Sequence, residues 1–366
     1  MGAGRRPPAP GWGSRWIWAG WGRHSGALRN DVSGPPSLSL REVADRAGVA
    51  MSSVSRVLSG HPDVSVAMRA RVMAVVDELG YEPNMLAASL RRGSTMTVAA
   101  VVRDVSSPFY AAMALAAESA LRKAGYAMLV TSSQGSSELD AAQVSQFRRR
   151  KVDGLLLSVA DESDPATLTE VGRLQAPVVL VDCELAGVTG TSAVLCDHAG
   201  GIERVVEQLR GLGHRRVALV AGRVASRPAR ELVRAFEATC AWLSIAGVVE
   251  RDVVDPAGAE AATARMLQSR PTAVISGSAA ILPGVLHAAR AAGLRVPADL
   301  SVVTFDDAPL LEAVEPPIAA FDRDPVAVGR EAARLLLARI DGGPPETSSV
   351  AIQFTPRASC APAPGV

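Results

Sequence analysis

The chain has 366 residues, of which 48% are hydrophobic and 20% charged, and its net charge is +1. This length suits one large domain or several smaller ones, and the apolar content excludes a disordered chain. The sequence contains no uninterrupted apolar run of the ~18 residues that a membrane span requires, so we expect no membrane partner. Because the net charge is close to zero, any contact with nucleic acid must come from a local arrangement of side chains.

The cysteines form neither a metal-binding nor a disulfide pattern. They are scattered without a C-x-x-C pair, at Cys183, Cys196, Cys240 and Cys360. Scattered cysteines of this kind are typical of a reducing compartment. The sequence therefore favours a cytoplasmic protein.

Residues 1–37 differ in composition from the rest of the chain. They hold four of the five tryptophans among Gly, Pro, Ser and Arg, and their apolar stretch 16–21 is interrupted by Gly20. That stretch is too short for a secretory signal. We interpret residues 1–37 as a flexible extension, or as a stretch translated from upstream of the native start.

The sequence of residues 38–82 predicts three short helices. Ser39 and Glu42 have the spacing of a capping box, and apolar residues follow at helical intervals until a glycine. A second helix is predicted over 51–58, and a third begins after Ser65 and also ends at a glycine. Three helices in so short a segment enclose little core, so we expect a small module and not a full-sized domain.

From residue 97 onward, aliphatic and β-branched runs alternate with amphipathic helical stretches such as 109–124 and 202–212. This repeated alternation predicts a parallel, doubly wound α/β fold, because strands covered on both faces read as continuous apolar runs. The predicted strands are 97–102, 127–131, 154–159, 178–182, 217–220, 273–275 and 301–305.

Two helices joined by a tight turn, the second rich in short polar side chains, are typical of helix-turn-helix DNA-binding proteins. In that arrangement the second helix enters the major groove, and its exposed side chains contact base edges. A small helical module without this function has the same periodicity. The pattern alone therefore leaves both interpretations open.

Three segments of this module carry a more specific signal. They read LREVADRAGV over 40–49, SVSRVL over 53–58 and LGYEPN over 79–84, and together they resemble the DNA-binding headpiece of the LacI family of bacterial transcriptional regulators. The resemblance extends to about residue 356. Its further matching segments are SPFY at 107–110, VDGLL at 152–156, LGHRRVA at 212–218 and GLRVPADLSVV at 293–303.

The resemblance implies a domain organisation for the whole chain. It implies no cofactor and no metal ion. It implies an α/β protein with an N-terminal three-helix helix-turn-helix headpiece and a periplasmic-binding-protein-like effector domain of two doubly wound parallel α/β subdomains. The implied segments are the headpiece at 38–82, a hinge helix and linker at 83–93, an effector-binding and dimerisation domain at 97–356, and a C-terminal tail at 357–366.

The resemblance also assigns the second helix to base recognition. Arg56 is then placed to grip a guanine edge, and Ser53 and Ser55 to contact phosphates, although helix capping would explain both serines equally well. Ala50 stands where the family usually has a capping serine, which gives up about 1 kcal/mol. The residues predicted to contact DNA are Met51, Ser52, Ser53, Ser55, Arg56, Asn84 and Leu90.

The hinge and the local charge add two expectations. Leu90 matches the leucine that family members insert into the minor groove to kink the operator, whereas without the resemblance it would be interpreted as a core residue. Ala88 replaces the arginine or glutamine common in the family, which weakens that contact. Residues 1–93 carry a net charge of +5, but the extension supplies +4 of it. Operator affinity is therefore expected to need two headpieces, and hence a homodimer or a tetramer.

The effector-binding positions depart from the family pattern. Leu232 stands where sugar-binding and nucleobase-binding members usually have an arginine, and Ser278 begins the pair that replaces their Asn-Asp. An unpaired buried hydroxyl costs roughly 1–3 kcal/mol, so we predict that common mono- and disaccharides do not bind. The effector is then a less polar molecule or is absent, unless Arg227 or Arg230 replaces the missing arginine. The predicted effector-binding residues are Phe109, Asp197, Arg230, Leu232, Ser278 and Asp306.

Catalytic motifs are missing from the sequence. It contains no Gx4GK, HExxH or GxSxG motif, and its five histidines are dispersed. The sequence therefore predicts a non-enzymatic dimeric regulator, a repressor that binds a pseudo-palindromic double-stranded operator under control of a small-molecule effector. One alternative is a solute-binding protein, which needs an export signal and has no headpiece. Another is an α/β enzyme with an accessory helical module, which needs a nucleophile or a phosphate-binding motif.

Overall fold

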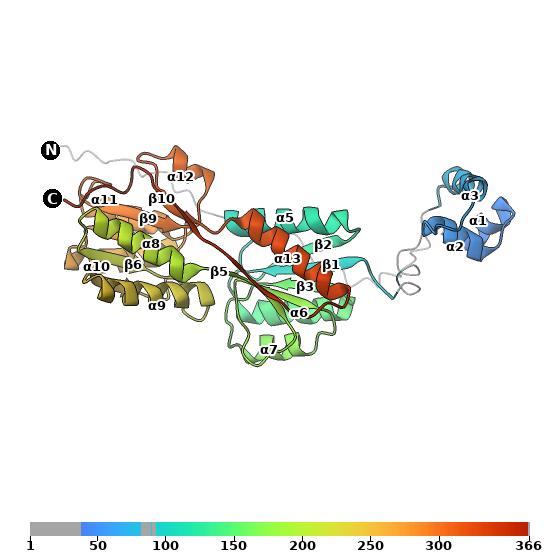
Figure 1. Ribbon diagram of the computed structural model, residues 1–366, viewed down its shortest axis with the longest axis horizontal. Coiled ribbons are helices and arrows are strands. Elements are labelled where there is room, and N and C mark those ends of the chain that lie inside the picture. Colours follow the sequence, from blue (N-terminus) through green and yellow to red (C-terminus); the bar gives the residue numbers. More distant parts are fainter. Residues whose placement is uncertain (1–37, 82–88, 90–92, 365–366) are drawn as a thin grey trace, which may run out of the picture. The chain divides into compact units, whose positions relative to one another are not determined.

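The computed structural model describes residues 38–81, 89 and 93–364 (Figure 1). The chain divides into two compact units, 1–84 and 85–366, and each is described by itself. The extension 1–37 and the predicted DNA-contacting residues Asn84 and Leu90 lie outside the described residues.

The first unit contains the three predicted helices. Ser39 and Glu42 form the expected capping box at the first helix, whereas Ala50 supplies no side-chain cap to the second. The helices pack around a small core whose most buried members are Val43, Val54 and Val72, each 0% exposed. The helices are α1 (Leu40–Ala47), α2 (Met51–Leu58) and α3 (Val66–Leu79).

The second unit consists of two α/β subdomains, each built on a six-stranded sheet. The N-terminal sheet is all parallel, in the order β11-β5-β4-β3-β1-β2. Its strands are β1 (Thr97–Val102), β2 (Ala127–Ser132), β3 (Gly154–Leu157), β4 (Val178–Val181), β5 (Ser192–Cys196) and β11 (Thr347–Val350). Its helices are α5 (Pro108–Lys123), α6 (Ser137–Arg150), α7 (Pro165–Gly172) and α13 (Pro325–Ile340).

The C-terminal sheet has the order β12-β10-β9-β8-β6-β7, and only its edge strand β12 is antiparallel. Its strands are β6 (Arg216–Val220), β7 (Ala246–Glu250), β8 (Ala273–Ser276), β9 (Ser301–Phe305), β10 (Ala319–Asp322) and β12 (Gln353–Thr355). Its helices are α8 (His198–Gly211), α9 (Arg227–Trp242), α10 (Pro256–Met266), the 3-10 turn η1 (Leu267–Ser269), α11 (Leu282–Ala291) and α12 (Pro309–Ala313).

Helices cover both faces of each sheet, which explains why the strands read as unbroken apolar runs. In β1, Val98 and Val102 belong to the same core cluster as residues of α5 and α13, while Ala99 packs with α6 and α7. Helix α13 lies directly against α5, as Figure 1 shows. Gly329 makes this contact possible, because a Cβ there would stand 2.2 Å from the carbonyl oxygen of Met113.

The chain passes between the subdomains three times: from β5 into α8, from β10 into α13, and from β11 into β12. Because the central strands of both sheets are parallel, the carboxyl ends of these strands meet where the subdomains face each other. We call this region the junction.

The main differences from the sequence predictions concern short elements. Strands β1 and β9 have the predicted bounds, but β5, β7, β10, β11 and β12 were not predicted. Residues 357–364, expected as part of a tail, pack against the second sheet. The Oγ of Ser359 accepts a hydrogen bond from the amide of Ala319 at 2.8 Å and donates one to the carbonyl of Val302 at 2.6 Å.

Candidate functional site

Helix α2 has a buried apolar face and, opposite it, an exposed face that is mostly polar. Val54 and Val57 anchor it in the headpiece core at 0% and 3% exposure. The predicted base-contacting side chains point the other way: Met51 is 52% exposed, and Ser52 and Arg56 are also exposed. Ser53 and Ser55 are half-buried beside them.

Arg56 is positioned for contact with an external acceptor. Within residues 38–81, the structure gives its guanidinium no ion pair, in contrast to Arg46, which binds Glu78 at 2.5 Å. A guanidinium can bind the O6 and N7 atoms of guanine through two parallel hydrogen bonds. The exposed face of α2 therefore has the chemistry of a major-groove reader.

The junction is centred on a buried carboxylate, Asp182, at the end of β4. Its side chain is 1% exposed, and its Oδ2 lies 2.8 Å from Nε2 of His198. Arg227 donates from Nη1 to Oδ1 at 3.0 Å, and Arg323 donates from Nη1 to Oδ2 at 2.9 Å. Burial acts to raise the pKa of Asp182, but His198 and Arg323 outweigh it and hold this pKa far below its usual range.

Arg323 connects this carboxylate to a second one. It follows β10, and its Nε donates to Oδ1 of Asp306, at the end of β9, at 2.7 Å. Its guanidinium carbon also lies 3.5 Å from the ring centroid of Phe109, a cation–π contact. Burial acts to lower the pKa of Arg323, but the two carboxylates raise this pKa above its usual value.

A second group of contacts crosses the junction through Glu162. This carboxylate, only 6% exposed, follows β3 of the N-terminal sheet. Its Oε1 accepts a hydrogen bond from the backbone amide of Arg227 at 2.6 Å, and its Oε2 binds Nη2 of Arg230 at 2.7 Å. Its own amide donates to the carbonyl of Ala225 at 3.3 Å. Acidic groups of one subdomain therefore bind the first turn of α9 in the other.

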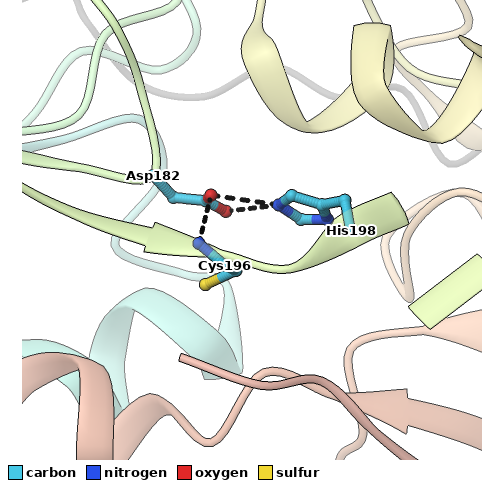
Figure 2. Close-up of side chains that lie close together, drawn as sticks. All are labelled: Asp182, Cys196 and His198. Atoms are coloured by element: carbon cyan, nitrogen blue, oxygen red, sulfur yellow. Dashed lines mark hydrogen bonds and ion pairs between the residues drawn. The ribbon is translucent and has the colours of Figure 1, made fainter. Parts of the chain in front are cut away.

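Asp182, Cys196 and His198 also bring possible metal-ligand atoms within 4.8 Å of one another (Figure 2). The chemistry of this trio does not fit a metal ion. Both oxygens of Asp182 are already bound by arginines, which repel a further cation. Burial raises the pKa of the Cys196 thiol well above its ordinary value, which disfavours the thiolate that metals bind.

The predicted effector-binding residues have different surroundings in the structure. Phe109 and Asp306 both contact Arg323. Arg230 is half-exposed and forms an ion pair with Glu162. Asp197 caps α8 by accepting a hydrogen bond from the amide of Gly200 at 3.0 Å. Leu232 is 2% exposed in the hydrophobic core, so its side chain is not presented to a ligand in this conformation. The carbonyl of Ser278 accepts a hydrogen bond from the hydroxyl of Ser276.

Sequence reasoning missed Asp182, His198, Glu162 and Arg323. The only available signal was Asp182 itself, the acidic residue at the end of the predicted strand 178–182. Arg323 lies 141 residues from Asp182 in the chain, and only the paired subdomains bring the two together.

Comparison with known proteins gives two family matches. Residues 39–84 match the profile described as "Bacterial regulatory proteins, lacI family", and residues 206–360 match "Periplasmic binding protein-like domain". The HTH-type transcriptional regulator MalR of Streptomyces coelicolor is 32% identical over 340 residues, which cover 89% of this chain and 97% of that protein. The ribose operon repressor of Escherichia coli K12 is 30% identical over 326 residues, covering 87% and 97%.

Solved structures show the same architecture. The cellobiose complex of the transcriptional regulator CelR has a TM-score of 0.66 and 28% identity, covering 88% of this chain and 99% of that one. The lac repressor dimer bound to operator and the anti-inducer ONPF has a TM-score of 0.79, covering 89% and 100%. At 24% identity, this second match shows the fold alone.

Proposed function

Because the chain belongs to the LacI family of bacterial regulatory proteins, and is thus a DNA-binding transcriptional regulator, we propose that it is a repressor whose α2 reads a pseudo-palindromic operator. The observation that carries this proposal is the exposed Arg56 on a helix anchored by Val54 and Val57. Met51 and Ser52 share this exposed surface and would contact neighbouring bases, with Ser53 and Ser55 toward the phosphates. Asn84 and Leu90 are proposed to contact DNA from the hinge.

We propose that the protein acts as a homodimer joined along the β2 side of its N-terminal subdomain. Strand β2 is an edge strand, and its Leu129 and Val130 are 38% and 40% exposed. Leu115 on the neighbouring α5 is 70% exposed. An exposed edge with apolar side chains favours pairing with a second copy, and two copies would supply the two headpieces that a palindrome needs.

For the effector, we propose either a ligand less polar than a common mono- or disaccharide or no effector at all. Leu232, where the family resemblance leads us to expect an arginine in sugar-binding members, is buried. The polar groups of Asp306 and Arg230 are already paired. A sugar hydroxyl entering the junction would have to break these pairs. Calorimetry with maltose, ribose and cellobiose tests this, since micromolar binding of any one of them would contradict it.

We further propose that the protein is not an enzyme and acts in the cytoplasm, where its DNA partner is found. The described cysteines are all free thiols, which supports a reducing compartment. Among the described residues, no helix is long and apolar enough to cross a membrane.

The operator itself can be obtained by selecting genomic fragments that bind the purified full chain, followed by affinity measurement at fixed salt. We expect a motif with two-fold symmetry whose half-sites are bound far more tightly than scrambled DNA. Uniform binding to all fragments would contradict a sequence-specific repressor.

A further inference from the structure

We propose that Arg323 is an internal ligand of the junction, which holds the two subdomains closed without a small molecule. This inference rests on the proposed function, because it concerns how the effector domain of the regulator is controlled. It assigns to Arg323 the task that a bound effector would otherwise perform.

The position of Arg323 in the chain suits this role. It lies in the crossing between β10 of the C-terminal sheet and α13, which packs on the N-terminal sheet. From there, one guanidinium binds Asp182 of the N-terminal subdomain at 2.9 Å and Asp306 of the C-terminal subdomain at 2.7 Å. Because these carboxylates end strands of different sheets, moving the subdomains apart must break at least one of the two ion pairs.

The surroundings of the guanidinium resemble a ligand-binding site that is already filled. Phe109 stacks on one face of the group, and charged acceptors bind its edges. A planar polar effector would use the same kinds of contact, an aromatic face and directed hydrogen bonds. The side chain of Arg323 is only 6% exposed. Another molecule can therefore bind here only if it displaces the guanidinium.

The backbone at both carboxylates supports the same conclusion. Asp182 and Asp306 have φ values of 52° and 65°, in the left-handed region that side-chain-bearing residues seldom adopt. Such conformations persist where surrounding contacts hold them. Arg323 contacts both residues and supplies part of that restraint.

Two backbone amides report directly on closure. The amide of Glu162 donates across the junction to Ala225, and the amide of Arg227 donates across it to Glu162. Arg227 is the first residue of α9, so its amide has no acceptor within its own helix. Both amides lose these acceptors when the subdomains separate.

Hydrogen–deuterium exchange of the full chain tests the proposal without knowledge of any effector. In the wild-type protein alone, we expect slow exchange in peptides that contain Glu162 and Arg227. In Arg323→Met, these peptides should exchange about tenfold faster or more, because the opening equilibrium shifts. Arg295→Met is the matched control, since Arg295 pairs with Asp299 in its own segment, and it should leave exchange at the junction unchanged.

Peptides from β1 and β6 report whether each variant folds. If Arg323→Met loses protection in the peptides from β1 and β6, the variant Arg323→Lys is tested in its place. Lysine keeps the positive charge but lacks the planar guanidinium that binds both carboxylates. Faster exchange at the junction of a folded variant supports the proposal. Fast exchange in the wild type, or unchanged exchange in a folded Arg323 variant, overturns it. Operator binding by the wild type is measured in parallel, and its failure would overturn the proposed function while leaving the junction result to be judged by exchange alone.

Discussion

Replacing Asp182 with asparagine should destabilise the second unit strongly. The carboxylate is bound by two guanidinium groups, by His198 and by the amide of Cys196. Asparagine keeps one acceptor oxygen, turns an NH2 toward a donor, and leaves buried positive charge without its partner. Removing one member of a buried ion pair costs about 3–5 kcal/mol. With about 2–4 °C per kcal/mol, the value for domains of about 150–250 residues, Tm should fall by about 6–20 °C.

The difference in Tm between the wild type and Asp182→Asn should also depend on pH. The pKa of Asp182 is lowered in the folded protein, so its stabilising effect is fully present above the unfolded-state pKa of about 3.9. The effect is lost as the pH falls toward the folded-state pKa, because the protonated carboxyl resembles the amide. Thermal unfolding followed by circular dichroism should therefore show the same difference in Tm at neutral and mildly alkaline pH, and a smaller difference in acid.

Asp299→Asn provides the matched control. Asp299 makes the same kind of ion pair, with Arg295 at 2.8 Å, but at the surface of the C-terminal subdomain. Exposed pairs contribute little, so this variant should unfold close to the wild type at neutral pH. If the Tm of Asp182→Asn falls no further than that of Asp299→Asn, the ion pairs of Asp182 do not stabilise the second unit.

Three further predictions concern the hinge, the dimer and the core. Leu90→Ala, outside the described residues, should reduce operator bending in a gel-phasing assay while the second unit stays folded, and normal bending would assign Leu90 to packing. Leu129→Asp should shift sedimentation toward the monomer because it places a charge on the exposed β2 edge, whereas Leu139→Asp, at a similar exposure on α6, should remain dimeric. Gly329→Ala should lower the free energy of unfolding by about 1–3 kcal/mol through its clash with Met113, while Gly172→Ala, with open space around it, should be neutral.

Much of the fold was predictable because its signals are local. The capping box at Ser39 and the runs that became β1 and β9 depend on neighbouring residues alone, and the structure confirms them. Strands such as β7 and β11 escaped prediction because they mix small and polar residues with apolar ones. Their strand conformation comes from pairing with β6 and β5.

The junction was less predictable because its partners are distant in sequence. Asp306 and Phe109 were expected to contact an effector, and the structure brings both to Arg323, a residue with no local motif. The exposed face of α2 was easier to predict, since helical periodicity separates Val54 and Val57 from Arg56. Periodicity therefore predicted which face of α2 is exposed, and the family resemblance assigned DNA contact to that face, whereas the ion pairs between subdomains required the tertiary structure.

Operator recognition by α2 is tested most directly by a competition titration at fixed salt. Arg56→Ala should lose about 1–3 kcal/mol of binding free energy on the selected operator and relax the preference at one base pair in each half-site. Arg71→Ala removes the same charge from α3 and should leave base preference unaltered. An Arg56→Ala protein with wild-type affinity and wild-type preference at every position would contradict base recognition by α2.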